Sequence, residues 1–230
     1  MFWDRVAVVY DIFVHGINRK THTALRKIVG DLIQPEDVVL ECACGTGLLS
    51  QVIAGKCKAL TATDFAPNML KRAKKNCAAF RNITFRRADI TALDDPDDAF
   101  DAVVAGNVIH LLDTPMRALS ELNRVCKAGG KIIIPTYMNK ERKGKTGVFA
   151  AAAGKAGADF KRQFTVENYR RFFLDAGYKD VTITLAQGRI PCAVAVMRKK
   201  DAHKGGLEAV PQAKGLAEDG PFETRKTGGR

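Results

Sequence analysis

Short apolar runs of strand length alternate with helix-length segments through most of this 230-residue chain. Such alternation is typical of βαβ units, in which parallel strands lie side by side and helices cover both faces of the sheet. The last two runs are joined only by residues 186–191, too short for a parallel crossover, so they must pair antiparallel. We therefore expect an α/β fold with a seven-stranded, mostly parallel sheet and an antiparallel last strand. The expected strands are 37–43, 58–63, 82–87, 100–105, 131–135, 181–185 and 192–197.

Four segments between these runs have the features of helices. In one of them Thr114 can cap the helix, Pro115 suits its first turn, and Gly129-Gly130 is expected to close it. The expected helices are 48–54, 67–79, 114–126 and 165–176.

Composition divides the chain into three parts. Residues 1–36 have helical patterns and are expected to form a lid over the carboxyl edge of the sheet, where ligands bind in such folds. Residues 37–197 form the main domain, in which 137–164 is longer than common loops and is expected to line a substrate pocket. Residues 198–230 are rich in glycine and lack hydrophobic periodicity, so we expect a flexible basic tail.

The charge of the chain is positive and unevenly spread. There are 37 basic and 25 acidic residues, and residues 71–87 hold seven basic residues and no acid. Such a patch can contact nucleic acid or an anionic membrane surface. No aromatic interleaving strengthens the nucleic-acid interpretation. We expect no obligate nucleic-acid partner and leave open a peripheral contact with an anionic membrane.

Three absences in the sequence bear on location and metal content. No run of 18 apolar residues is present, and the first residues do not have the form of a secretory signal. The six cysteines are scattered, without a CxxC pair or zinc-type spacing. We expect a cytoplasmic protein with reduced thiols and no metal, and the sequence leaves its oligomeric state open.

The segment 39–47 predicts a strand that leads into a Gly-x-Gly turn and then a helix. Glycine is needed where the backbone has positive φ or lies close to a ligand. Asp64 ends the next strand, about 20 residues on, where a carboxylate can accept hydrogen bonds from both hydroxyls of a ribose. Together these features indicate a ligand that contains a nucleoside.

Glu41 distinguishes between two such ligands. A pyrophosphate dinucleotide needs backbone amides and no negative charge nearby, yet Glu41 ends the strand beside the turn. In addition, Ser50 occupies the third glycine position of a G-x-G-x-x-G motif. A ligand with a sulfonium and an amino group is instead favoured by this acid. S-adenosylmethionine has both groups and is the expected cofactor.

The same segments resemble the class I S-adenosylmethionine-dependent methyltransferases, in particular the small-molecule branch of ubiquinone and menaquinone C-methylases. The matching text is VLECACGTGLLS, TATDFAPNML, ITFRRADI, FDAVVAGNVIHLL and ELNRVCKAGGKIIIPTY. The resemblance is strong over residues 37–136 and weaker over 137–197, and it implies a Rossmann-like fold. Ala43 departs from the pattern, because the family usually has its first glycine there.

The resemblance implies a role for each matching residue at the first two strands. Glu41, Gly45 and Gly47 would line the methionine end of the cofactor, with Ala43 in the same turn. Asp64 would hold the ribose hydroxyls.

Further along the chain, the resemblance implies contacts with the adenine and the methyl group. Phe65 and Met69 would flank the adenine. Asp89 would accept a hydrogen bond from the adenine amino group, and Ile90 would supply a backbone amide. Asn107 would lie near the methionine moiety.

Methyl transfer from a sulfonium is an in-line displacement, so the protein mainly aligns donor and acceptor. A phenol, thiol or carbon acid needs a base near neutral pH, and His110, three residues after Asn107, is the expected catalytic residue. Tyr10, Asp11 and His15 in the expected lid are weaker candidates for substrate contact.

The expected acceptor is a small molecule that is quinone-like, phenolic or otherwise apolar. A lipid amine, an RNA or protein acceptor, and a cofactor-binding scaffold without turnover stay open as alternatives. Against a nucleic-acid base as acceptor, residues 106–110 read GNVIH where the base-amino methylases have Asn/Asp-Pro-Pro followed by an aromatic residue.

Overall fold

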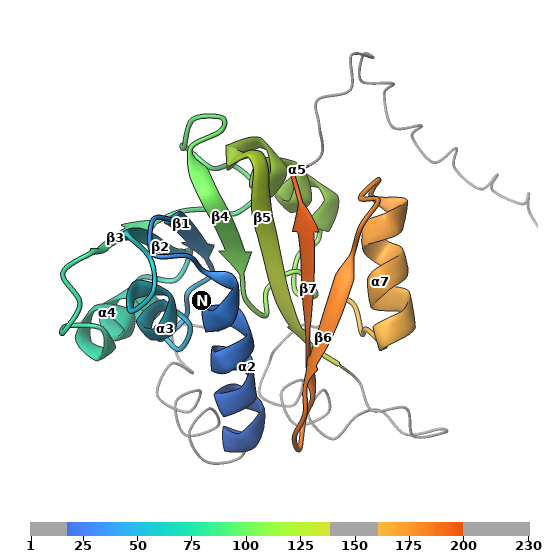
Figure 1. Cartoon of the computed structure of the whole chain (residues 1–230), viewed down its shortest axis with the longest axis horizontal. Coiled ribbons are helices and arrows are strands. Elements are labelled where there is room, and N and C mark those ends of the chain that lie inside the picture. The colour runs from blue at the N-terminus through green and yellow to red at the C-terminus, as the bar shows by residue number, and fades with distance from the viewer. Residues whose placement is uncertain (1–17, 139–160, 200–230) are drawn as a thin grey trace, which may run out of the picture.

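The structure is a computed structural model that describes residues 18–138 and 161–199. Seven strands form one sheet in the order β3-β2-β1-β4-β5-β7-β6 (Figure 1). β1 to β5 run parallel to one another, and β7 runs antiparallel to both β5 and β6. The expected fold class is therefore confirmed. The strands are β1 (Val38–Cys42), β2 (Ala59–Asp64), β3 (Ile83–Arg87), β4 (Phe100–Ala105), β5 (Cys126–Tyr137), β6 (Thr182–Ala186) and β7 (Cys192–Arg198).

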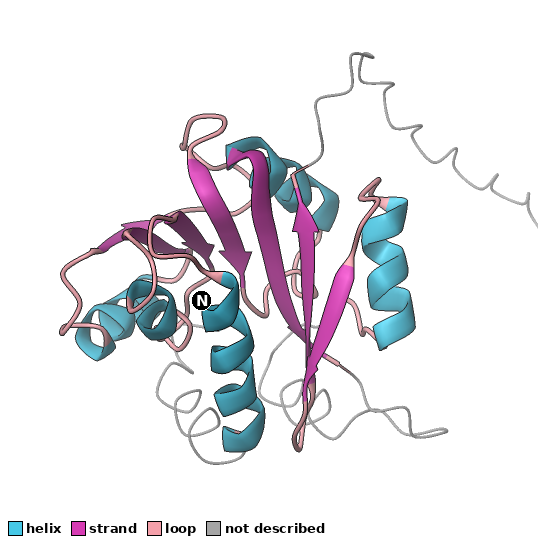
Figure 2. Ribbon diagram, in the orientation of Figure 1, coloured by secondary structure: helices cyan, strands magenta, loops and turns pink. Residues whose placement is uncertain are grey.

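Helices cover both faces of the sheet (Figure 2). Leu25, Ile53 and Leu70 from three helices pack into the hydrophobic core on one face, and Leu122 and Tyr169 from two others pack into the core on the opposite face. None of the described helices is both long and apolar enough to cross a membrane. The first three are α2 (Arg19–Leu32), α3 (Ser50–Ala54) and α4 (Pro67–Asn76), and the other two are α5 (Pro115–Val125) and α7 (Val166–Asp175).

The central strands are apolar at successive positions because both of their faces are buried. In β4, Ala102 and Val104 contribute to the core beneath α2–α4, whereas Val103 and Ala105 contribute to the core beneath α5 and α7. This is the burial pattern expected of a parallel sheet between two helical layers.

The beginning of β5 differs from the expectation that Gly129-Gly130 forms a closing turn after a helix. The strand begins at Cys126, directly after α5, and its register against β4 is interrupted before Lys131. Gly129 has a φ of +71°, and a Cβ on Gly130 would lie 2.8 Å from the carbonyl oxygen of Asp101. The two glycines therefore permit a bulge pressed against β4, and the prediction of a turn there was wrong.

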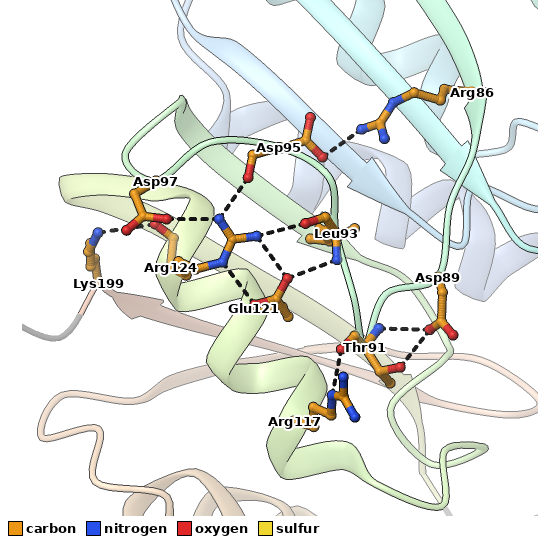
Figure 3. A network of polar contacts seen from close by, with 10 residues as sticks. All are labelled: Arg86, Asp89, Thr91, Leu93, Asp95, Asp97, Arg117, Glu121, Arg124 and Lys199. Carbon is orange, nitrogen blue, oxygen red and sulfur yellow. Dashed lines mark hydrogen bonds and ion pairs between the residues drawn. The ribbon is translucent and has the colours of Figure 1, made fainter. Parts of the chain in front are cut away.

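Arg124 on α5 fastens the connection between β3 and β4 to the body of the domain (Figure 3). Its guanidinium donates to the carbonyl oxygens of Leu93 and Asp95, at 2.8 and 2.7 Å. It also donates to the carboxylates of Asp97 and Glu121, both at 2.8 Å. Charge-assisted bonds of this kind are stronger than neutral ones, so the connection is held along its length.

The described part of the N-terminal segment lies along a face of the sheet, and its first turn contacts the loop between β6 and β7. Asn18 donates from Nδ2 to the carbonyl oxygen of Ile190 and accepts from its amide, at 3.0 and 3.1 Å. Thr21 donates to the same carbonyl, and a Cβ on Gly188 would collide with its hydroxyl. The lid expected within residues 1–36 stays a prediction, because residues 1–17 lie outside the described part of the chain.

Candidate functional site

The turn after β1 lies at the carboxyl edge of the sheet, and its backbone requires glycine at one position. Ala43, Gly45 and Gly47 have φ values of +55°, +57° and +91°. A Cβ on Gly47 would lie 2.8 Å from the Sγ of Cys77 and 3.3 Å from the Cα of Ala73, so the turn packs closely against α4. A Cβ on Gly45 would meet nothing within 4 Å. The turn is thus packed on one side and open at Gly45, where a ligand can approach.

Asp64 ends β2 beside this turn. Its Oδ2 accepts the amide of Gly45 and its Oδ1 accepts the amide of Ala66, both at 2.8 Å. The carboxylate is therefore held in place by backbone on both sides. Because each carboxylate oxygen has two lone pairs, both oxygens can accept a further hydrogen bond from a ligand hydroxyl.

Glu41 is buried beneath the turn, with 2% of its surface exposed. Burial raises the pKa of its carboxyl from 4.5 to about 8, the hydrogen bond from Ser50 Oγ at 2.5 Å opposes this shift, and the charge of Asp64 adds to it. Near neutral pH the carboxyl is therefore mostly protonated. A cationic group placed beside it would favour the ionised form.

An apolar surface adjoins Asp64 at the start of α4. Phe65 is 45% exposed, and the Arg87 guanidinium lies 4.9 Å from the centroid of its ring. Arg87 also donates from Nε to the Phe65 carbonyl at 3.0 Å. Met69 and Ala66 are buried as a small cluster apart from the two main cores. The structure thus places both residues expected at the adenine next to the residue expected at the ribose.

Asp89 follows β3 at the same edge of the sheet (Figure 3). Its Oδ1 accepts from the amide and the hydroxyl of Thr91, at 2.8 and 2.7 Å. Within the described residues Oδ2 accepts no such bond, so it is available to a ligand. The side chain of Ile90 is buried in the core, which holds its backbone at this turn.

Asn107 joins the ends of β4 and β5. It has a φ of +54°, its amide donates to the Pro135 carbonyl at 2.8 Å, and its Oδ1 accepts the Tyr137 amide at 3.1 Å. Asparagine tolerates this left-handed backbone better than most residues. The residue expected near the methionine moiety therefore also shapes the turn after β4.

His110 is buried, and burial lowers the pKa of its imidazole from 6.5 to about 4. Its backbone carbonyl accepts the amide of Arg162 at 3.1 Å, which ties the turn to the segment before α7. Near neutral pH the imidazole is therefore neutral and weakly basic. The weaker candidates Tyr10, Asp11 and His15 lie outside the described residues.

A buried polar pair at the same edge was missed by reasoning from the sequence. His22 on α2 and Tyr137 at the end of β5 share a hydrogen bond of 2.6 Å between Nε2 and Oη, although 115 residues separate them. They are only 3% and 9% exposed. No local sequence signal marks such a pair, because each residue alone looks like a member of an amphipathic element.

The cysteines of the turn are packing residues in the structure. All six cysteines are free and buried. Burial raises the pKa of the Cys42 thiol to about 12 and raises that of Cys44 well above its usual value. A thiol that stays protonated is a poor nucleophile, so this geometry gives them no covalent role.

Comparison with known sequences supports the class that the site suggests. Residues 40–134 match a family described as a methyltransferase domain. The chain is 29% identical to a demethylmenaquinone methyltransferase of Paenarthrobacter aurescens over 232 residues, covering 92% of this chain and 89% of the relative. It is 34% identical to a phosphatidylethanolamine N-methyltransferase of Cereibacter sphaeroides over 107 residues, or 45% and 52% of the two chains. Against four curated relatives the chain spans only 31% to 56% of their length.

Solved structures share the fold. A SAM-dependent methyltransferase of Thermotoga maritima superposes with a TM-score of 0.64 at 19% identity, covering 86% of this chain and 98% of that one. The trans-methyltransferase CalH, solved as a complex with SAH, gives a TM-score of 0.61 at 20% identity over 78% and 58% of the two chains.

The sheet order and the turn between β1 and α3 agree with this sequence match. Over residues 40–134 the chain has the sequence of a methyltransferase domain, and its described fold is shared with solved SAM-dependent methyltransferases.

Proposed function

We propose that the chain transfers the methyl group of S-adenosylmethionine to a small, lipid-soluble acceptor of the quinol type. The observation that carries the acceptor class is the relative from P. aurescens, because that match extends over 92% of this chain. It therefore includes the region after β5, where we expect acceptor specificity to lie. The relative that acts on a lipid amine matches only 45% of the chain.

The geometry around the first turn fits the methionine and ribose parts of this cofactor. We assign the ribose hydroxyls to Asp64, whose carboxylate is held by two backbone amides. The open side of Gly45 gives room for the ligand. We assign the cationic end to Glu41, because a buried carboxyl with a raised pKa gains a partner when a cation approaches.

The remaining contacts are assigned from their positions at the same edge. Phe65 and Met69 would flank the adenine, and the Oδ2 of Asp89 would accept from its amino group. Ile90 would supply a backbone amide, and Asn107 would lie near the methyl group.

When bound, S-adenosylmethionine supplies an electrophilic methyl group on a sulfonium. The residues of this chain then hold donor and acceptor in line and exclude water. We assign to His110 the role of hydrogen-bond partner for an acceptor hydroxyl, because its imidazole is neutral near pH 7. A base with a pKa of about 4 is poorly matched to neutral pH, so ionisation of the acceptor must not depend on full proton transfer to it.

We also retain the domain organisation as a proposal. Residues 1–36 would close over the site, 37–197 would form the methyltransferase domain, and 137–164 would line the acceptor pocket. Two described parts of these segments meet at the carboxyl edge of the sheet. His22, in the first turn of α2, shares a hydrogen bond with Tyr137, at the end of β5.

Calorimetric titration of S-adenosylhomocysteine into the full chain tests the cofactor assignment. We expect micromolar affinity, weakened about 10- to 100-fold in Asp64→Ala, since hydrogen bonds to a charged group contribute about 1.5–3 kcal/mol. Asp94→Ala, an exposed acid on the β3–β4 connection, is the matched control and should bind normally. Absence of binding to the unaltered chain would refute the assignment.

Methyl transfer to a short-chain demethylated naphthoquinol, followed by mass spectrometry, tests the acceptor separately. The expected product is the ring-methylated quinol together with S-adenosylhomocysteine. Cofactor binding without this product, but with methylation of phosphatidylethanolamine, would move the acceptor to the lipid amines.

A further inference from the structure

Two consecutive segments of the domain carry opposite charge. Between Asp64 and Asp89 the chain has seven basic residues and no acid, whereas residues 89–121 have eight acids and one Arg or Lys. The first group lies on and around α4, which covers one face of the sheet with α2 and α3. The second group lies largely on the β3–β4 connection and α5, which contribute to the core on the other face. These two segments, which contribute to opposite faces of the sheet, therefore differ in the sign of their charge.

Three lysines on α4 have no ion-pair partner within the described residues. These are Lys71, Lys74 and Lys75, which lie at helical spacing and are exposed. The opposite side of the same helix packs inward through Leu70 and Ala73. α4 thus presents one continuous basic side to solvent, which we call the α4 basic side.

The acids of the opposite face are largely paired within the protein (Figure 3). Arg124 pairs with Asp97 and Glu121, both at 2.8 Å. Arg86 pairs with Asp95 at 2.5 Å. The negative charge of this connection and of α5 is therefore largely neutralised within the protein, whereas Lys71, Lys74 and Lys75 have no ion pair among the described residues.

A second helix on the same face of the sheet, α2, carries further basic residues. On α2, Arg19, Lys20 and Lys27 line an open hollow, although Lys27 is paired with Asp31 at 2.6 Å. Charges spread over two helices of one face favour a broad anionic partner over a single small anion.

We propose that the α4 basic side docks the protein on an anionic lipid bilayer. This proposal rests on the proposed function, because a lipid-soluble acceptor resides in a membrane that none of the described helices can span. α4 begins at Pro67, three residues after Asp64, so docking through α4 brings the carboxyl edge of the sheet close to the lipid surface. The exposed side of α4 carries no aromatic ring, which disfavours stacking with nucleic-acid bases.

Co-sedimentation of the full chain with vesicles tests this surface. The test variant is Lys71→Gln with Lys75→Gln. The control is Arg170→Gln with Lys179→Gln, which removes the same charge from exposed positions on and after α7, the helix on the opposite face of the sheet. Glutamine keeps a helix propensity close to that of lysine. Vesicles of phosphatidylcholine with phosphatidylglycerol are compared with phosphatidylcholine alone, at low and at high salt.

We expect binding only to the vesicles with phosphatidylglycerol, and release at high salt. The Lys71→Gln, Lys75→Gln variant should bind vesicles about 30-fold more weakly, which is the typical contribution of one basic residue near an anionic membrane surface taken twice. The control variant should bind less than about 3-fold more weakly. An equal loss of vesicle affinity in the test variant and in the control variant would refute docking through the α4 basic side. Tighter, Lys71- and Lys75-dependent binding to homopolymeric RNA than to vesicles would assign the surface to nucleic acid instead.

Failure of this proposal is distinguishable from failure of the proposed function. S-adenosylhomocysteine affinity and methyl transfer to a water-soluble short-chain quinol are measured on the same preparations and do not require a vesicle. If both activities are intact while the protein does not bind vesicles with phosphatidylglycerol, the docking proposal is wrong and the methyltransferase proposal stands.

Discussion

Replacing Ala43 by glycine should relieve strain in the turn after β1. Ala43 has a φ of +55°, a left-handed conformation that places its Cβ close to the following carbonyl oxygen. Among the described residues, the other non-glycine positions with positive φ are Asp98 and Asn107, residue types that adopt this conformation more readily. Ala43 is thus the position in this site where a side chain and its backbone conformation disagree most.

Three contributions set the expected magnitude. The left-handed backbone costs alanine about 1–2 kcal/mol, which glycine avoids. Glycine adds about 0.4–1 kcal/mol of entropy to the unfolded chain, and the half-buried methyl of Ala43 contributes roughly 0.4 kcal/mol by burial. The net expectation for Ala43→Gly is a stabilisation of about 0.5 kcal/mol.

A matched variant isolates the strain. Ala78→Gly alters an exposed alanine that is not among the positive-φ residues, so it should lose about 0.4–1 kcal/mol. Because both variants change the unfolded chain alike, the difference between them should be about 1 kcal/mol in the free energy of unfolding by urea, with equal slopes. If Ala43→Gly is as destabilised as Ala78→Gly, the left-handed turn carries no strain and the reasoning is refuted.

Three further substitutions give distinct outcomes. Gly47→Ala should lose about 2–4 kcal/mol in urea unfolding, because the new Cβ would meet Cys77 at a positive φ, and a loss under about 1 kcal/mol would contradict the close packing. The raised pKa of Glu41 contributes stability that is full below pH 4.5 and is lost as pH rises to about 8, by up to about 5 kcal/mol. The free energy of unfolding of Glu41→Gln should therefore rise relative to that of the unaltered protein between these pH values. Parallel profiles of unfolding free energy against pH would refute this. Tyr137→Phe should lose about 1–3 kcal/mol by leaving the buried His22 without its 2.6 Å partner, and unchanged thermal unfolding would contradict it.

The sheet was predictable from the sequence because its central strands are buried on both faces and are therefore apolar at successive positions. The bounds of β4 were predicted without error, and β1 and β2 end within a residue of their predicted ends, so the adjacency of the first turn and Asp64 was also predictable. The start of β5 was not predictable, because Gly129-Gly130 is equally typical of a turn and of a bulge. Only the pairing of β5 with β4 distinguishes the two.

The polar contacts between distant elements lay beyond the sequence. The pairing of His22 with Tyr137 depends on α2 packing against the sheet beside β6 and β7, and no periodicity in either segment encodes the partner. The role of Asn107 was anticipated only in part. Its position after β4 was expected, whereas the bond from its Oδ1 to β5 depends on the strand order.

The attachment of Asn18 to Ile190 has a consequence for the order of folding. These residues are 172 positions apart, so the contact closes a loop that spans almost all of the described chain. Contacts of such long range form late, because the entropy of closing the loop must be overcome first. On the ribosome, α2 emerges before any strand, yet the first turn of that helix finds its partner only when the hairpin of β6 and β7 has been made. We therefore expect the nascent domain to complete the carboxyl edge of its sheet as one of its last steps of assembly.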